Sequence, residues 1–209
     1  MLTIKDLKNV FADKNVFITG HTGFKGSWLA FLLKEVGANV FGFSLQPETA
    51  TNNFDLLNLK NNMNQFIGDI RDPEDLNNEL KKFQPQFVFH LAAQALVRSS
   101  YNDPFSTFST NIMGSVNILE AVRNCSSVRS LVFITSDKCY KNVEWVWGYR
   151  ENDELGGHDP YSASKAASEI IHSSYIKSFF DNFTSLGSAS TRAYSVLMLH
   201  VACTLYCTV

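Results

Sequence analysis

Short runs of apolar residues alternate along the chain with longer stretches in which apolar residues recur every three or four positions. The short runs predict strands at residues 15–19, 39–43, 65–67, 87–91 and 131–135. The longer stretches predict helices at residues 24–36, 72–84, 103–124 and 161–180. The predicted strands are apolar throughout, as expected of a sheet covered by helices on both faces. The pattern therefore predicts an α/β fold with a doubly wound parallel sheet of the Rossmann type.

Local signals support two of these boundaries. Asp72, Pro73 and Glu74 combine a helix N-cap, a first-turn proline and an acidic charge that the helix dipole favours. Gly37 stands where the helix predicted at residues 24–36 should end. No repeat, low-complexity segment or linker interrupts the alternation, so we expect one dinucleotide-binding domain over residues 1–193.

The composition is that of an ordinary globular protein. Hydrophobic residues make up 45% of the chain and charged residues 18%, and the net charge is −2. This balance gives no electrostatic reason to expect nucleic acid or a membrane as a partner. The N-terminus lacks the apolar core of a signal peptide. The four cysteines (Cys125, Cys139, Cys203 and Cys207) form no CxxC pair, which predicts a reduced, cytoplasmic protein without a metal site.

The last sixteen residues, 194–209, contain no Asp, Glu, Lys or Arg, and one histidine, His200. A membrane anchor needs about 20 apolar residues, so this stretch is short for one. A sixth strand at residues 188–199 would explain only part of it. We expect the remainder to be an atypical apolar tail that marks a truncation or a change of reading frame.

Three glycines between the first predicted strand and the following helix indicate a phosphate site. They are Gly20, Gly23 and Gly26, in the stretch ITGHTGFKGSW. The first allows a tight turn, the second allows the backbone to approach a pyrophosphate, and the third allows the helix to pack close to the sheet. The helix N-terminus then offers N–H groups to the phosphates.

The ends of the next two strands bear on which dinucleotide is bound. An acidic residue after the second strand would bind a free ribose 2′-hydroxyl, and an arginine would bind a 2′-phosphate. Ser44 stands there, so the absence of a basic residue favours NAD over NADP without deciding between them. Asp69, at the end of the third strand, can meet the amino group of an adenine.

Candidate catalytic residues follow the fifth predicted strand. Ser136, Asp137 and Lys138 lie at the strand end, where open parallel sheets place their reactive groups. Tyr161 and Lys165 are four residues apart, and so share one face of a helix. A free phenol has a pKa near ~10, and a neighbouring ammonium and an oxidised nicotinamide ring would lower it and make the phenolate a usable base.

Together these motifs resemble the extended short-chain dehydrogenases/reductases, and within them the sugar-nucleotide 4,6-dehydratases. The resemblance extends from residue 13 to residue 192, and the branch that acts on CDP-glucose is most similar. Its motifs are TGHTGFKGSW, IGDIRD, FHLAAQALVR, STNIMGSVNILEA, ITSDKCY, EWVWGYRE and DPYSASK. It implies NAD as cofactor, a nucleotide-sugar substrate and a homodimer. The cofactor residues that it implies are Gly20, His21, Thr22, Gly23, Phe24, Lys25, Gly26, Ser44, Asp69, Ile70, Leu91, Ala92, Ala93, Gln94, Tyr161 and Lys165.

The resemblance also implies a redox-neutral elimination. Tyr161, assisted by Ser136 and Lys165, would remove the proton of the C4 hydroxyl while NAD takes the C4 hydride. Lys138 would be the base at C5, and Asp137 the acid that helps the C6 hydroxyl to leave as water. A charged lysine cannot act as a base, so Lys138 must lose its proton in the site. Return of the hydride to C6 gives CDP-4-keto-6-deoxyglucose.

The end of the chain departs from this family. Where the family reads VRAGNVIGGGDW, this chain keeps Arg192 and Ala193 but continues with Tyr194 and Ser195. The resemblance thus predicts that the substrate lobe is largely missing and that dehydration by the chain is weak. Two alternatives stay open: a nucleotide-sugar epimerase or reductase, and a dinucleotide-binding fragment without catalytic activity. Asp137 and Lys138 argue against the first alternative, because neither epimerisation nor reduction needs that pair.

Overall fold

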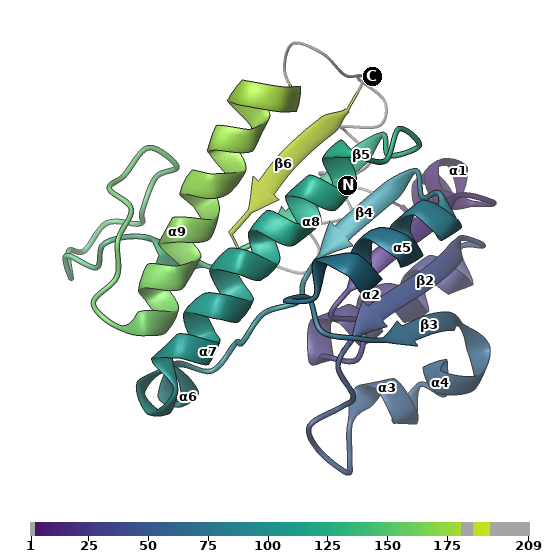
Figure 1. Ribbon diagram of the computed structural model, residues 1–209, viewed down its shortest axis with the longest axis horizontal. Helices are drawn as coiled ribbons and strands as arrows, with labels where there is room; N and C mark the ends of the chain where they lie inside the picture. The colour runs from purple at the N-terminus through teal and green to yellow at the C-terminus, as the bar shows by residue number, and fades with distance from the viewer. Residues whose placement is uncertain (1–2, 181–185, 193–209) are drawn as a thin grey trace.

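The computed structural model describes residues 3–180 and 186–192 (Figure 1). Within them, six parallel strands form one sheet in the order β3-β2-β1-β4-β5-β6. The strands are β1 (Asn15–Thr19), β2 (Asn39–Ser44), β3 (Asn64–Ile67), β4 (Phe87–His90), β5 (Ser130–Ile134) and β6 (Gly187–Thr191). The order reverses between β1 and β4, which is the switch point where doubly wound sheets bind ligands. The predicted fold class is confirmed.

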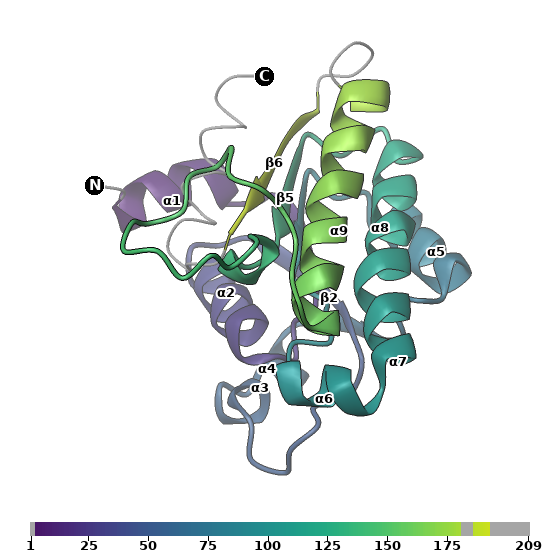
Figure 2. The same cartoon turned by 90° about the vertical axis from the view of Figure 1, so that its left-hand side faces the viewer.

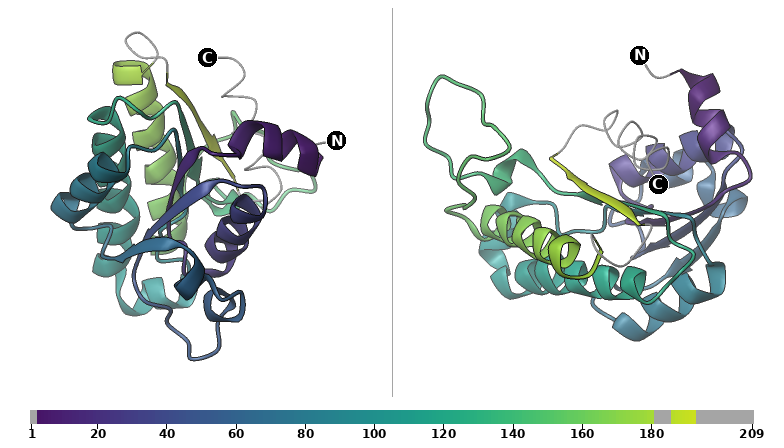
Figure 3. Two further views of the ribbon diagram at one scale, coloured as in Figure 1. Left: turned by 90° about the vertical axis from the view of Figure 1, so that its right-hand side faces the viewer. Right: turned by 90° about the horizontal axis from the view of Figure 1, so that it is seen from above.

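Helices cover both faces of the sheet. Figure 2 shows α5, α8 and α9 along one face and α1 and α2 along the other. The helices are α1 (Ile4–Phe11), α2 (Phe24–Glu35), α3 (Asn53–Leu56), α4 (Leu59–Asn62), α5 (Pro73–Phe83), α6 (Val97–Asn102), α7 (Pro104–Phe108), α8 (Gly114–Arg123) and α9 (Pro160–Tyr175). A connection that contains no regular helix or strand over most of its length, residues 140–158, extends away from the sheet (Figure 3, right).

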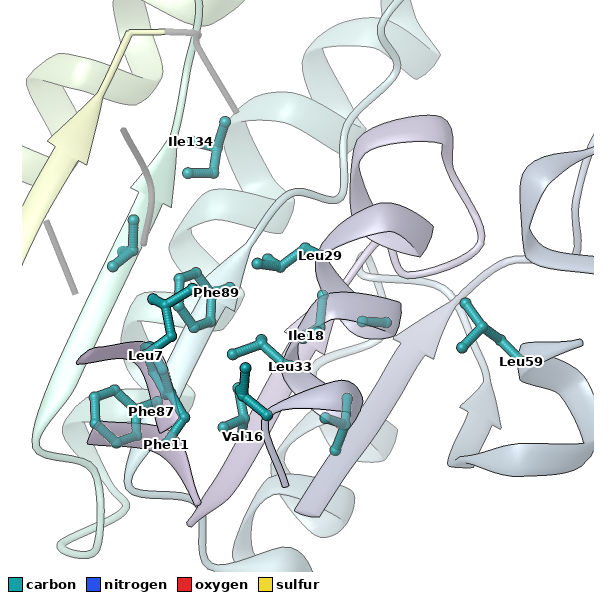
Figure 4. Close-up of a cluster of buried hydrophobic side chains, with 14 of the residues drawn as sticks. Leu7, Phe11, Val16, Ile18, Leu29, Leu33, Leu59, Phe87, Phe89 and Ile134 are labelled. Atoms are coloured by element: carbon teal, nitrogen blue, oxygen red, sulfur yellow. The ribbon is translucent and has the colours of Figure 1, made fainter. Parts of the chain in front are cut away.

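Alternate residues of the strands supply two separate cores, because side chains along a strand point to opposite faces. Val16 and Ile18 of β1 pack with Leu7 and Phe11 of α1 on one face (Figure 4). Phe17, between them in sequence, packs on the opposite face with the apolar side of α5 and α8. Burial of both faces explains why the central strands are apolar throughout.

The structure modifies two of the predicted elements and, within the residues that it describes, adds four helices that were not predicted, α1, α3, α4 and α6. The helix expected at residues 103–124 consists of α7, a π-helical turn (Ser109–Met113) and α8. The helix expected at residues 161–180 likewise ends in a π-helical turn (Ile176–Phe180) after α9. Helix α1 was not predicted, although the Thr3 and Asp6 side chains that form its capping box were a visible signal.

In the part of the chain that the structure describes, no helix is both long and apolar enough to cross a membrane. The sixth strand is present at Gly187–Thr191, and Arg192 already lies beyond its end. The remaining residues of the stretch predicted for it are 193–199. Those residues and the apolar tail at 194–209 lie outside the described residues, as does the boundary expected between residues 193 and 194.

Candidate active site

A cavity of about 1000 Å³ opens at the carboxyl ends of the strands. It is lined by the segments that follow β1, β2, β3 and β4, by the end of β5 and by the start of α9. Fifteen of the sixteen predicted cofactor residues line it: Gly20, Thr22, Gly23, Phe24, Lys25, Gly26, Ser44, Asp69, Ile70, Leu91, Ala92, Ala93, Gln94, Tyr161 and Lys165. The topology therefore brings the glycine turn and the Tyr161–Lys165 pair into one space.

The three glycines serve two different purposes. A Cβ at Gly20, whose φ is +77°, would lie 2.8 Å from the Ala92 nitrogen, and one at Gly26 would lie 2.1 Å from the Gly20 carbonyl oxygen. The fold itself requires both glycines. A Cβ at Gly23 would meet only the Gly20 oxygen, at 3.4 Å, and would otherwise extend into open space. Gly23 is also the N-cap of α2 and provides no side-chain cap, so the first N–H groups of the helix are not capped by it.

The His21 side chain is the predicted cofactor group that the structure does not place in the cavity. It is fully buried, and its Nε2 lies 2.9 Å from Gln65 Oε1. Its ring occupies the space over Gly42, where a Cβ would come within 2.3 Å of it. Burial lowers the pKa of His21. The residue can thus contribute to the turn through its main chain, and its side chain packs in the interior.

Hydrogen bonds order the end of the cavity beside β2. The Thr22 hydroxyl donates to the Leu45 carbonyl oxygen at 2.9 Å. Its single proton is used there, so the Ser44 hydroxyl donates to Thr22 Oγ1, 2.7 Å away. Ser44 therefore keeps its oxygen lone pairs as acceptors.

Arg71, which was not among the predicted site residues, forms an ion pair with the carboxylate of Asp69. Its Nε lies 3.0 and 2.9 Å from the two carboxylate oxygens, and its main-chain N–H also donates to one of them. The side-chain hydrogen bond from Arg71 lowers the pKa of Asp69, and burial opposes the shift. Asp69 is therefore an ionised acceptor at the edge of the cavity.

Tyr161 and Lys165 line the cavity from the first turns of α9. The Lys165 Nζ is 6.0 Å from the centre of the Tyr161 ring. Burial raises the pKa of Tyr161, and the nearby Ser136 hydroxyl opposes that effect. Burial is the larger cause, and the charge of Lys25 the smaller one, that lowers the pKa of Lys165 to about 8. The phenol thus has a hydroxyl nearby and a neighbouring cation that could lose its proton.

Ser136 belongs to a turn directly after β5, which continues as a single 3₁₀ turn, Asp137–Cys139. The Ser136 hydroxyl donates to the Asp137 carboxylate at 3.0 Å and accepts the Lys138 N–H at 3.2 Å. Asp137 and Lys138 are exposed and do not line the cavity. Ser136 does not line the cavity either, although it lies near Tyr161. Asp137 and Lys138 follow it in the same turn. The catalytic roles of these residues stay predictions.

Asn111, which lies in the motif STNIMGSVNILEA, is a buried structural support of the site and was not among the predicted site residues. Its amide oxygen accepts the Gln94 N–H at 2.8 Å, and its amide nitrogen donates to the Gln94 carbonyl oxygen and to Ser164 Oγ. Gln94 lines the cavity, and Ser164 lies on α9 beside Lys165. Asn111 therefore fixes one wall of the cavity to the helix that carries Tyr161.

A second buried pair supports the end of β4. Thr19 Oγ1 accepts the N–H groups of Leu91 and Ala92, at 3.1 and 3.2 Å. Its proton is then directed to His90 Nδ1, 2.8 Å away. Burial and the charges of Lys165 and His172 lower the pKa of His90 to about 3, so the ring is neutral. Among residues 3–180 and 186–192, no group of three or more His, Cys, Asp and Glu side chains could hold a metal ion.

The sequence matches the family model described as GDP-mannose 4,6 dehydratase over residues 17–194. A CDP-glucose 4,6-dehydratase of Salmonella typhimurium is 50% identical over 194 residues, which cover 91% of this chain and 54% of that protein. A CDP-paratose 2-epimerase of Salmonella typhi is 31% identical, with coverage of 78% and 53%. The chain thus spans about half the length of the curated relatives it matches.

Solved structures with the same fold include enzymes with NAD bound. A UDP-glucose 4-epimerase of Thermus thermophilus, in complex with NAD, has a TM-score of 0.72 and 33% identity, over 85% of this chain and 54% of that one. A dTDP-glucose 4,6-dehydratase of Streptomyces venezuelae, DesIV, also with NAD, has a TM-score of 0.71 and 25% identity, over 85% and 55%.

Proposed function

The chain belongs to the GDP-mannose 4,6-dehydratase family, and on that premise we propose that it takes part in the NAD-dependent dehydration of CDP-glucose to CDP-4-keto-6-deoxyglucose. The observation that carries the proposal is the single cavity shared by the glycine turn, Tyr161 and Lys165. CDP-glucose is favoured as substrate because the 50% identical relative is a CDP-glucose 4,6-dehydratase. The whole reaction converts one nucleotide sugar into a ketone and one water, with C4 oxidised and C6 reduced.

The residues present fit NAD. Gly23 leaves open space that the packing of the protein does not need, at the uncapped start of α2, which is the arrangement that accepts a pyrophosphate. Among the described residues that line the cavity, the cations are Lys25 and Lys165, and the segment after β2 contributes Glu48. Because none of these described cations follows β2 beside Ser44, the lining supports a free ribose 2′-hydroxyl and hence NAD. When bound, NAD supplies a site that accepts a hydride from C4 and returns it to C6.

The chain's own residues would move the protons. Tyr161 would remove the proton of the C4 hydroxyl, with Ser136 sharing that hydrogen bond and Lys165 stabilising the phenolate. The ketone at C4 makes the C5 proton acidic, and Lys138 would remove it. Asp137, which the Ser136 hydroxyl contacts, would give a proton to the departing C6 hydroxyl. The loss of the C5 proton and of the C6 hydroxyl together amounts to one water.

The second candidate is an epimerase. It is favoured by the 31% identical CDP-paratose 2-epimerase and by the epimerase structures, which share the fold. Asp137 and Lys138 favour dehydration, because an elimination requires an acid and a base beside the ketone and a simple epimerisation does not. The products formed from CDP-glucose distinguish the two: a 4-keto-6-deoxy sugar has a ketone and a methyl group, whereas an epimer of CDP-glucose has neither.

The test of the cofactor site is Gly23→Ala. The added methyl group occupies the space where the backbone would approach the pyrophosphate, so we expect NAD affinity to fall by about tenfold or more (~1.4 kcal/mol) without a loss of stability. Gly148→Ala is the matched control, because no atom lies within 4 Å of a Cβ at that position. Calorimetric titration with NAD and urea denaturation measure the two quantities. Equal NAD affinity in Gly23→Ala and the wild type would argue against this site.

The test of the reaction is Tyr161→Phe. This variant should bind NAD normally and form the 4-keto product at least about 10²-fold more slowly, because general acid–base catalysis contributes at least that much. The product is measured by its absorbance in base and by the mass of the reaction mixture, which loses one water. Full turnover by Tyr161→Phe would remove the phenol from the mechanism.

We also propose that the protein acts in the cytoplasm, which the free thiols of Cys125 and Cys139 support. A homodimer, implied by the family resemblance, stays a prediction.

A further inference from the structure

The turn that follows β5 (residues 136–139, the post-β5 turn) contains Ser136, Asp137 and Lys138 and has a largely buried ion pair beside it. The pair is formed by Glu169 of α9 and Arg192, which follows β6, at 3.2 Å. We propose that this ion pair positions the post-β5 turn by holding the residue on each side of it, Thr135 through Glu169 and Tyr140 through Arg192. The catalytic meaning of that position rests on the proposed function, whereas the anchoring itself does not.

Glu169 connects the helix of Tyr161 to the start of the turn. Tyr161, Lys165 and Glu169 follow one another at intervals of four residues, and each is less than 9% exposed. The Glu169 carboxylate accepts hydrogen bonds from the Thr135 hydroxyl and, at 2.9 Å, from the Ser190 hydroxyl. Burial raises the pKa of Glu169, but these hydrogen bonds and the Arg192 charge outweigh it and hold the pKa below its usual value. The carboxylate is therefore ionised, and it links α9 to β6 and to the end of β5.

Arg192 holds the end of the turn. Its Nη1 donates to the Tyr140 hydroxyl and, at 3.1 Å, to the Glu151 carbonyl oxygen. Its guanidinium carbon lies 4.8 Å from the centre of the Tyr140 ring, and that ring stacks on Tyr149 at 5.2 Å with an interplanar angle of 9°. The main-chain N–H of Tyr140 donates to the Asp137 carbonyl oxygen at 3.2 Å, which closes the turn. Tyr140 thus connects the Arg192 side chain to the main chain of Asp137.

The buried ion pair of Glu169 and Arg192 is better suited to fixing the position of the turn than to stabilising the fold. Burying two charges removes them from water, and this cost can equal or exceed the attraction between them. Neither Glu169 nor Arg192 lines the cavity, so both would act through the residues that they hold. A displacement of about 1 Å can reduce a reaction rate by about 10²-fold. An exposed turn that carries an acid and a base therefore benefits from a fixed support on both sides.

Two buried cysteines allow release of the post-β5 turn to be distinguished from general unfolding. Cys139, in the post-β5 turn, is fully buried, and burial raises the pKa of its thiol to about 11. Cys125 is also buried and free, and it lies in the connection between α8 and β5, outside the turn. Alkylation of each cysteine can be followed separately by mass spectrometry. Release of the turn alone exposes Cys139, whereas general unfolding exposes both cysteines.

We expect Arg192→Met and Glu169→Gln to accelerate alkylation of Cys139 by about tenfold or more, while the rate at Cys125 changes by less than about twofold. Arg192→Lys, which keeps the charge, should restore part of the protection. The matched control is Arg123→Met: Arg123 pairs with Glu120 at 2.6 Å and lies 4.8 Å from the Phe179 ring centre, but it is remote in the fold from the turn. This control should leave Cys139 protected.

Two milder variants cover the case in which the larger changes prevent folding. Thr135→Val removes only the hydroxyl that donates to Glu169, and Tyr140→Phe removes only the hydroxyl that accepts from Arg192. Each should raise Cys139 alkylation by a few-fold. Unchanged Cys139 rates in all four variants, or equal acceleration at Cys125, would overturn the proposal. Failure of the wild type to bind NAD would instead contradict the proposed function and leave the alkylation result valid.

Discussion

At the scale of single residues, Lys165 combines a cost to folding with a use in the site. It is 7% exposed, and burial and the Lys25 charge lower its pKa from 10.5 to about 8. The charged form is therefore less favourable in the folded state than in the unfolded state. The same ammonium lies beside the Tyr161 ring, where it can stabilise a phenolate. A buried charged residue that serves catalysis destabilises the fold, so its replacement by an apolar residue should increase the free energy of unfolding.

We therefore expect Lys165→Met to raise the free energy of unfolding at pH 7 by about 2–3 kcal/mol, since a tenfold change in proton affinity corresponds to ~1.4 kcal/mol. At pH 7, Lys165 is charged in both states, and the folded state bears the full cost. Between about pH 8 and 10.5 the folded state loses its proton first, so the wild type gains stability and the difference shrinks. Urea denaturation at pH 7 and about pH 9.5 measures both values.

The control for this prediction is Lys82→Met on the exposed side of α5, which should change stability little at either pH. A Lys165→Met difference that stays constant between the two pH values would show that packing, and not the charge, causes the effect.

At the scale of elements, the π-helical turn between α7 and α8 shapes the site. Hydrogen bonds to the fifth residue widen this turn, and such insertions are common at functional sites. Asn111 lies inside it, is 2% exposed and makes three hydrogen bonds, two to Gln94 and one to Ser164. The turn thus presents the Asn111 amide to the cavity wall at Gln94 and to α9 at Ser164.

We expect Asn111→Leu to lower the free energy of unfolding by about 2–4 kcal/mol, because it leaves buried partners without a hydrogen bond. It should also raise the rate of amide hydrogen exchange at Gln94, whose N–H loses its acceptor. Asn124→Leu is the matched control: Asn124 is exposed, and its side chain donates to the preceding turn of its own helix. Equal losses of stability in the two variants would contradict a special role for Asn111.

At the scale of the whole molecule, the chain provides a doubly wound sheet within the described residues and a cavity for a dinucleotide. It spans 54% of the Salmonella typhimurium relative. Turnover of the proposed sugar substrate makes a further demand beyond binding of the dinucleotide, because a substrate must be held in register with both the cofactor and the acid–base residues.

We expect these 209 residues, tested by themselves, to bind NAD and to dehydrate CDP-glucose at least about 10²-fold more slowly than the full-length Salmonella typhimurium relative, since that factor is typical of a poorly positioned substrate. Formation of the 4-keto product at equal enzyme concentration measures the ratio. The relative itself is the positive control. Equal rates would show that the matched half is sufficient for catalysis.

Features that depend on neighbouring residues could be predicted without a structure. The apolar runs indicated five strands within a few residues of their observed ends, and Asp72 does cap α5. The order of strands and helices was enough to predict the parallel sheet, because short right-handed connections leave few other topologies. The glycine turn and the Tyr161–Lys165 pair were likewise found from spacing alone, since both lie within one turn or one helix.

The directions of individual side chains became visible only in the folded molecule. His21 lies beside two cofactor candidates in sequence but turns into the interior, because Gly42 leaves room for its ring and Gln65 lies within hydrogen-bonding distance. The ion pair of Glu169 and Arg192 depends in the same way on strands and helices that meet only after folding. Periodicity and capping act between residues a few positions apart, whereas these orientations depend on contacts between distant segments, such as the 71 residues that separate Thr19 from His90. A single sequence does not record those contacts.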